Sequence, residues 1–245
     1  MAPARKPTAT ERPIRDVPWR VLAALMIALV LQCSWHFRQP APAATAADLG
    51  APPVLPQRLH GGDPISVAQW LLLYLQSFDN QPGISIPFSR LDYPQVLRWL
   101  ASALSLDPAS SYPLLMASQI YSQLPDAGRQ RMMCDFVQER FMEAPDARWR
   151  WLAHCAIMAK HRLKDPSLAL RYATAIAESA GKASSWARQM RIFLLEDMGE
   201  LDSARVLLGG LLANGEVTDD TEKRFLTERL LSMESARKST GATNK

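Results

Sequence analysis

The stretch that decides the fold is GELDSARVLLGGLLANG, residues 199–215. It reads as a helix, and similar helical patterns follow one another from Pro64 onward, from ISVAQWLLLYLQSF at 65–78 to DDTEKRFLTERLLSME at 219–234. No convincing run of alternating strand residues appears between them, although residues 84–88 look extended within a loop at 79–92. The sequence therefore predicts an all-α body over residues 64–236, built from antiparallel helix pairs that short turns connect.

The helical body contains an internal repeat. Ala169 and Ala204 are 35 residues apart, and so are Trp151 and Trp186. Ala169 and Ala204 occupy the same position of the repeat, which we call the slot. Counting back from Ala169 by 36 and then 37 residues places Met133 and Val96 in this slot. A fixed period of this length indicates an array of stacked helix pairs.

This spacing resembles the tetratricopeptide repeat (TPR). In the stretch 199–215 the resemblance assigns Gly199 to the tight turn, Ala204 to the close helix contact and Leu208 to a bulky packing position. LRWLASALSLDP at 97–108 is similar to the end of a second repeat helix, with Ala103 at its small position and Pro108 at its proline. The resemblance covers about residues 64–216, or three to four repeats, and departs from the family in lacking most of its Trp-Leu-Gly-Tyr pattern. It implies a TPR-like array that binds peptides or extended segments.

The segment VPWRVLAALMIALVLQCSWHF, residues 17–37, predicts a single transmembrane helix. The basic residues of the tail at 1–16 favour a cytoplasmic N-terminus, which places the body in the periplasm. Residues 38–63 are rich in Pro and Ala and read as a linker, and residues 237–245 read as a disordered tail. Three alternatives are cleavage after the small-residue triplet at 41–43, lipidation of Cys33 and a buried helix of a soluble protein. Gln32 is an unusual residue before a lipidated cysteine, and the proline-rich flanks argue against a buried helix.

The charge distribution argues against nucleic acid as a partner. The net charge of +4 arises at the two ends of the chain, because residues 64–236 hold 18 basic and 20 acidic residues, a net charge of −2. A nucleic-acid-binding protein usually concentrates Lys and Arg on its folded domain.

The sequence contains few signs of a catalytic or metal-binding site. WLAHCAIMAKHRLKDP at 151–166 places His154, Cys155 and His161 close together. In a helix, however, the two histidines are separated by a rise of about 10.5 Å, whereas a single helix normally binds zinc through residues at i and i+4. We therefore expect no metal site, no cofactor and no catalytic residues.

The cysteines leave two alternatives open. Cys134 and Cys155 fall on neighbouring helices of the predicted array, so a disulfide is geometrically conceivable in an oxidising periplasm. Each also fits as a small buried residue, which is the commonest state of a free cysteine. We expect both to be reduced and buried, and Cys33 in the predicted span has no partner in the chain.

These observations favour a membrane-anchored adaptor in the inner membrane that binds protein partners of an envelope complex. The residues expected to face a partner are Trp149, Arg150, His154 and His161. Two alternatives are that the array is an accessory domain of an envelope enzyme, for which little chain is left to supply a catalytic domain, or that the same scaffold faces the cytoplasm.

Overall fold

The computed structural model describes the chain except residues 1–16, 39–46, 54–62, 82, 216 and 244–245. The predicted cytoplasmic tail at 1–16 and most of the predicted linker therefore lie outside the described residues. The chain divides into two compact units, one of Met1–Thr45 with Pro82–Ile84 and one of Ala46–Gln81 with Ser85–Lys245. The first contains helix α1, and the second contains all the other described helices.

Helix α1 (Trp19–Arg38) coincides with the predicted span at 17–37. None of its residues is buried, and it is long and apolar enough to cross a membrane by length and composition. The expectation of one N-terminal apolar helix is confirmed at that level.

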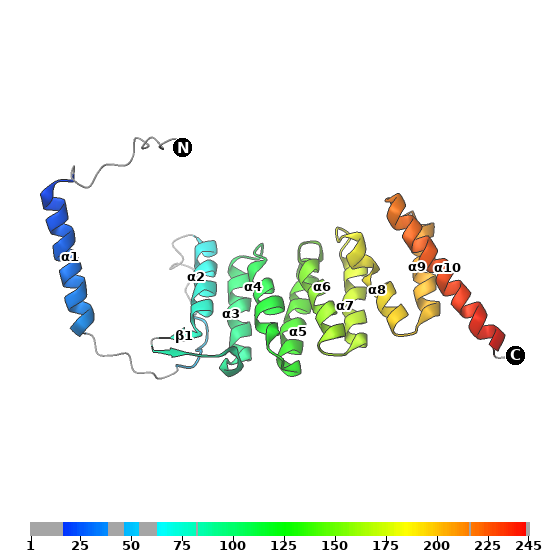
Figure 1. Ribbon diagram of the computed structural model, residues 1–245, viewed down its shortest axis with the longest axis horizontal. Coiled ribbons are helices and arrows are strands. Elements are labelled where there is room, and N and C mark those ends of the chain that lie inside the picture. The colour runs from blue at the N-terminus through cyan, green and yellow to red at the C-terminus, as the bar shows by residue number, and fades with distance from the viewer. Residues whose placement is uncertain (1–16, 39–46, 54–62, 82, 216, 244–245) are drawn as a thin grey trace, which may run out of the picture. The chain divides into compact units, whose positions relative to one another are not determined.

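The body is an array of helices in which consecutive members contact each other (Figure 1). The first pair is α2 (Pro64–Ser77) and α3 (Tyr93–Leu106). Between them lie the short strands β1 (Asn80–Gln81) and β2 (Ile84–Ser85) and the 3-10 turn η3 (Phe88–Arg90). Helix α4 (Tyr112–Leu115), the π-turn η4 (Met116–Ile120) and the 3-10 turn η5 (Tyr121–Gln123) precede α5 (Ala127–Glu143).

The remaining helices continue the array to the C-terminal end. They are α6 (Pro145–His161), α7 (Pro166–Ser179), α8 (Ser185–Asp197), α9 (Leu201–Ala213) and α10 (Asp220–Thr243). The all-α prediction is confirmed, and the packed pairs are compatible with a helical repeat. Helix α10 extends beyond the predicted boundary at 236, so residues 237–243, which we expected to be disordered, are helical.

Local sequence sets the helix boundaries. Proline is the first residue of α2, α6 and α7, where its missing N–H costs no hydrogen bond. The carboxylates of Asp63, Asp126 and Asp165 cap α2, α5 and α7 by accepting hydrogen bonds from backbone N–H groups in the first turn. Gly199 turns the chain between α8 and α9 with a φ of 80°, a conformation that side chains with a Cβ rarely adopt.

The segment from 112 to 123 is irregular, passing from α4 through η4 to η5. The hydroxyl of Ser118 donates to the carbonyl of Leu114 at 2.8 Å, and the hydroxyl of Ser122 donates to the carbonyl of Ser118. Both serines are buried. Side-chain bonds to the preceding turn compete with the helical ladder, which accounts for the passage from α-helix to π-turn to 3-10 turn.

The repeated slot is part of the core. Its four occupants lie on the second helices of successive pairs and are fully buried: Val96 on α3, Met133 on α5, Ala169 on α7 and Ala204 on α9. The periodicity read from the sequence therefore corresponds to a repeated packing position. Ala103, which the resemblance placed at another close contact, is also fully buried.

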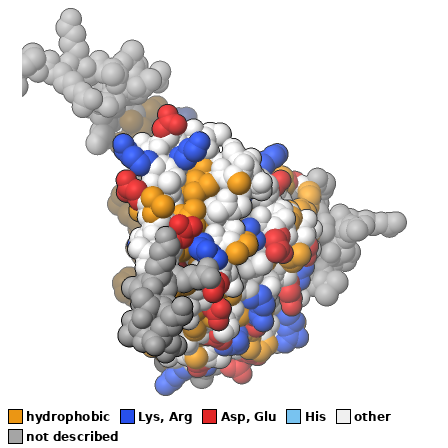
Figure 2. Space-filling model, turned by 90° about the vertical axis from the view of Figure 1, so that its right-hand side faces the viewer, with side chains coloured by type: hydrophobic (Ala, Val, Ile, Leu, Met, Phe, Trp, Pro, Cys, Tyr) orange, Lys and Arg blue, Asp and Glu red, His pale blue; other side chains and the backbone are white. Residues whose placement is uncertain are grey.

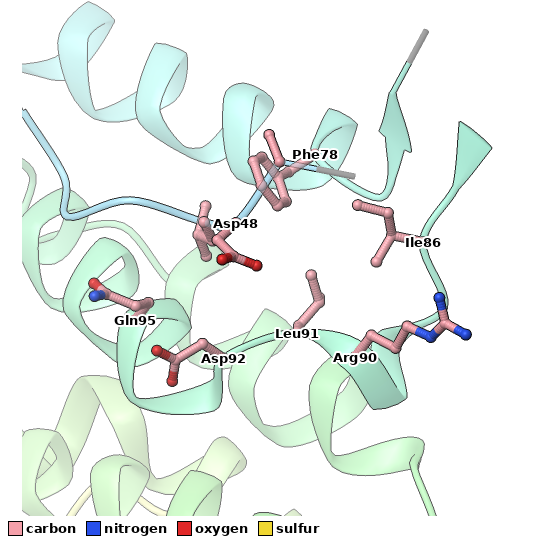
Figure 3. A pocket seen from close by; sticks show the side chains of 9 residues that line it. Asp48, Phe78, Ile86, Arg90, Leu91, Asp92 and Gln95 are labelled. Carbon is pink, nitrogen blue, oxygen red and sulfur yellow. The ribbon is translucent and has the colours of Figure 1, made fainter. Parts of the chain in front are cut away.

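Part of the predicted linker packs on the body. The backbone N–H of Ala47 donates to Gln81 Oε1 at 2.8 Å, Leu49 is buried in the core, and Trp99 Nε1 donates to the carbonyl of Gly50 at 2.8 Å. We call residues 47–50 the docked segment. It forms one wall of a cavity of about 610 Å³, which Asp48 enters from the segment and Asp92 from the start of α3 (Figure 3).

Candidate functional site

Helices α6 and α8 lie side by side, and two contacts fix their register. Near the start of both helices, the rings of Trp149 and Trp186 meet edge to face with centroids 5.6 Å apart. Near the end of both helices, the ammonium group of Lys160 pairs with the carboxylate of Asp197. Each contact joins residues that are 37 positions apart, so the two helices run parallel over their common length.

A groove with a volume of about 320 Å³ runs between the two contacts. Two rows of side chains line it: Ala156, Ile157, Lys160 and His161 from α6, and Trp186, Met190, Phe193 and Leu194 from α8. The side chain of Trp186 is 52% exposed and that of Ile157 is 45% exposed. Large apolar side chains that share an open groove mark a surface that can receive another apolar group.

The groove contains few charged side chains. Lys160 is paired with Asp197, and His161 follows as the last residue of α6. The lining is otherwise apolar, so the groove favours an apolar side chain of a partner over a charged small molecule. A polar rim around an apolar centre is the usual composition of a protein–protein contact.

The structure separates the four residues that the sequence predicts to face a partner. His161 lines the groove, whereas Trp149 is mostly buried and only borders it through its contact with Trp186. The guanidinium of Arg150 lies over the Trp149 ring, 5.4 Å from its centroid. His154 is half-buried on the side of α6 that packs against η4.

The environment of His154 lowers the pKa of its imidazole. Burial is the largest cause, and the positive charge of Arg162 adds to it, while a backbone hydrogen bond with Ser118 acts in the opposite direction. His154 and His161 thus lie in different surroundings. Among the residues that the structure describes, no three His, Cys, Asp or Glu side chains are grouped as metal ligands would be.

Sequence reasoning missed Trp186, Met190 and Phe193, which form the α8 side of the groove. The offset of 35 residues, which relates Ala169 to Ala204, also pairs Trp186 with Trp151. Contacts between α6 and α8 instead join residues 37 apart, which brings Trp186 to Trp149. A tryptophan two residues into a repeat helix is the sequence signal that points to the groove.

The expectation that Cys134 and Cys155 are reduced is wrong, because a disulfide joins them, with Cα atoms 5.5 Å apart. Both cysteines are fully buried, as expected. A single residue, Ala144, connects α5 to α6. Cys134 lies ten residues before Ala144 and Cys155 eleven residues after it, so the antiparallel hairpin sets them opposite each other. The near-equal spacing of the two cysteines about the turn is the sequence signal for this disulfide.

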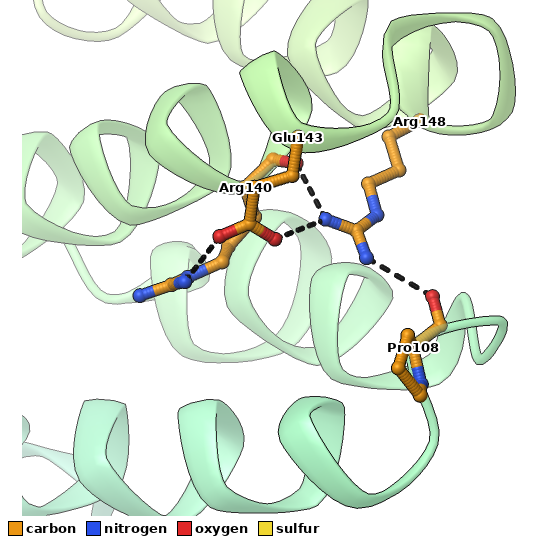
Figure 4. Close-up of polar contacts among 4 residues, drawn as sticks. All are labelled: Pro108, Arg140, Glu143 and Arg148. Carbon is orange, nitrogen blue, oxygen red and sulfur yellow. Dashed lines mark hydrogen bonds and ion pairs between the residues drawn. The ribbon is translucent and has the colours of Figure 1, made fainter.

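A buried arginine holds the start of α6 (Figure 4). Arg148 donates from Nη1 to the carbonyl of Arg140 at 2.6 Å and to Glu143 Oε2 at 2.7 Å, and from Nη2 to the carbonyl of Pro108 at 3.0 Å. Its hydrogen bond is the largest cause that lowers the pKa of the Glu143 carboxyl, and Arg140 adds to the effect. This network joins α6 to the ends of α3 and α5 and positions the neighbouring Trp149.

Comparison with known proteins does not assign this chain to a family. No family model, no curated protein and no solved structure matches it.

Proposed function

We propose that this protein is a membrane-anchored, TPR-like scaffold whose body faces the periplasm and binds a partner protein in the groove between α6 and α8. The single observation that carries the proposal is the groove itself, in which Trp186 and Ile157 are about half exposed although they belong to packed helices. A partner helix or extended segment would insert an apolar side chain between the two rows.

The repeat supports the TPR-like part of the proposal. The slot at Val96, Met133, Ala169 and Ala204 recurs at 35 to 37 residues, and each occupant is fully buried. Stacked helix pairs of this kind serve as binding surfaces more often than as reaction centres.

Two observations support the orientation. The apolar helix α1 follows a basic N-terminal sequence, which favours a cytoplasmic N-terminus. The disulfide between Cys134 and Cys155 fits an oxidising compartment, because disulfides are rare in the cytosol.

The test is purification of the full-length protein in mild detergent, followed by identification of what it retains. Trp186→Ala removes the largest exposed side chain of the groove. Phe225→Ala is a matched control, because Phe225 on α10 is an aromatic side chain that is 55% exposed and lies outside the groove. We expect a protein retained by the wild type and by Phe225→Ala to be lost from Trp186→Ala. Equal retention by all three forms would contradict the groove as the binding site.

A further inference from the structure

The outer face of α2 is uncharged and largely apolar. Its exposed large side chains are Trp70, Leu73 and Tyr74, which are 51%, 64% and 42% exposed, and we call these three the α2 face. Their neighbours on the same side of the helix are Ser66, Gln69 and Ser77. The opposite side, with Ala68, Leu71, Leu72 and Leu75, is buried in the core. No Asp, Glu, Lys or Arg occurs in residues 64–77, so α2 is apolar on two sides.

The other end of the array is different. Helix α10 carries charges of both signs over its exposed turns: Asp220, Glu222, Lys223, Arg224, Glu228 and Arg229. Figure 2, which looks onto this end, shows Lys and Arg mixed with Asp and Glu. Terminal helices of repeat arrays need a polar outer face when they meet water. Helix α10 also exposes Phe225 and Leu231, by 55% and 58%, but among charged residues of both signs, whereas α2 has none. The α2 face is therefore the less suited of the two to contact with water.

Aromatic stacking connects the α2 face to the docked segment. The rings of Trp70 and Tyr74 are stacked with centroids 5.8 Å apart, and those of Tyr74 and Trp99 with centroids 5.0 Å apart. Trp99 in turn donates from Nε1 to the carbonyl of Gly50. The α2 face therefore adjoins the part of the chain that comes directly from the anchor.

Chain length limits how far this end of the body can be from the end of α1. Helix α1 ends at Arg38, and the docked segment begins at Ala47, which Gln81 holds just beyond the C-terminus of α2. Nine Cα–Cα steps span at most about 32 Å, whatever conformation they adopt. If α1 crosses the bilayer as proposed, the C-terminal end of α2 stays within about that distance of the end of α1, and so within reach of the membrane surface.

We propose that the α2 face docks on the lipid surface, with Trp70, Leu73 and Tyr74 at the boundary between headgroups and acyl chains. The inference rests on the proposed membrane anchoring. Trp and Tyr favour this boundary because their rings are amphipathic, and Leu73 adds apolar area. Since α2 has no basic side chain, docking requires no anionic lipid and is insensitive to salt. Docking of the α2 face restricts rotation of the body about the segment that connects it to α1. It thereby holds the α6–α8 groove at a fixed height above the bilayer.

A depth measurement in the full chain tests the proposal. In a Cys33→Ser background, Leu73→Cys on the α2 face or Leu231→Cys on α10 is labelled with an environment-sensitive fluorophore without reductant, so that the buried disulfide stays intact. Leu231 is 58% exposed and serves as the matched control. The labelled proteins are reconstituted at about one chain per vesicle in phosphatidylcholine that contains nitroxide-labelled lipid. We expect several-fold stronger quenching at position 73 than at position 231, unchanged by salt and reduced to the control level by Trp70→Ser with Tyr74→Ser.

The outcomes separate this inference from the proposed function. Equal quenching at both positions, in a chain that resists alkaline extraction, overturns membrane docking and leaves the anchor and the groove intact. A chain that alkaline extraction releases overturns both the anchor and the docking. Protection of position 73 that appears only at high protein density identifies a second copy as the neighbour and also overturns the proposal.

Discussion

Cys134 and Cys155 form a disulfide across the hairpin between α5 and α6, with their Cα atoms 5.5 Å apart. The hairpin turns at Ala144, and the bond closes it about halfway along both helices. Because α5 is the second helix of one pair and α6 the first helix of the next, the disulfide joins two repeats. The α6 wall of the proposed groove is thereby fixed to the repeat before it.

Removing this disulfide is expected to lower the stability of the body by about 3 kcal/mol, the amount estimated for a closed loop of this length. The measurement is thermal unfolding of the full chain in detergent, with wild type compared to Cys134→Ala with Cys155→Ala. Cys33→Ser is the control, because Cys33 is free and exposed on α1. Thiol labelling of the denatured, unreduced wild type is expected to detect one thiol. Three reactive thiols would show that the bond does not form.

The sequence predicts the helices and their pairing because the signals are local. Apolar periodicity marks each helix, while proline and aspartate at the starts and Gly199 at a turn mark boundaries. The features that it missed depend on contacts between distant residues. Burial of Arg148 depends on the carbonyl of Pro108, 40 positions away, and docking of Ala47 depends on Gln81, 34 positions away. The groove likewise depends on the register between α6 and α8, which sets Trp186 beside Trp149, 37 positions away.

Burial of the repeated slot predicts that a larger side chain at Ala204 destabilises the fold. This residue is fully buried, so Ala204→Leu inserts a larger side chain at a close contact between helices. We expect a loss of about 1–3 kcal/mol of unfolding free energy, as is typical of overpacked sites. Val206→Leu is the control, since Val206 lies on the same helix and is 67% exposed. An unchanged melting temperature for Ala204→Leu would remove the assignment of this slot as a helix contact.

The proposed orientation predicts the behaviour of reporters fused after Lys245. Alkaline phosphatase, which needs an oxidising compartment, is expected to be active there. A fluorescent protein that does not mature after export through the general secretory route is expected to stay dark. Each fusion is a control for the other. Only the phosphatase is active if the body is periplasmic, and only the fluorescent protein is active if the body is cytoplasmic. A fluorescent fusion together with an inactive phosphatase would place the body in the cytoplasm.

The Arg148–Glu143 pair predicts how stability depends on pH. In the folded protein the pKa of Glu143 lies below its ordinary value of 4.5, chiefly because Arg148 donates a hydrogen bond to the carboxylate. The ionised carboxylate therefore stabilises the fold above that ordinary value, and this contribution disappears as the pH falls through the lowered pKa. We expect Glu143→Gln to destabilise the protein in urea unfolding at neutral pH, and to destabilise it less at an acidic pH well below the ordinary value of 4.5. In an Arg148→Met background the same substitution should show a much smaller pH dependence. If Glu143→Gln shows the same loss at both pH values, the ion pair is not the source of the stabilisation.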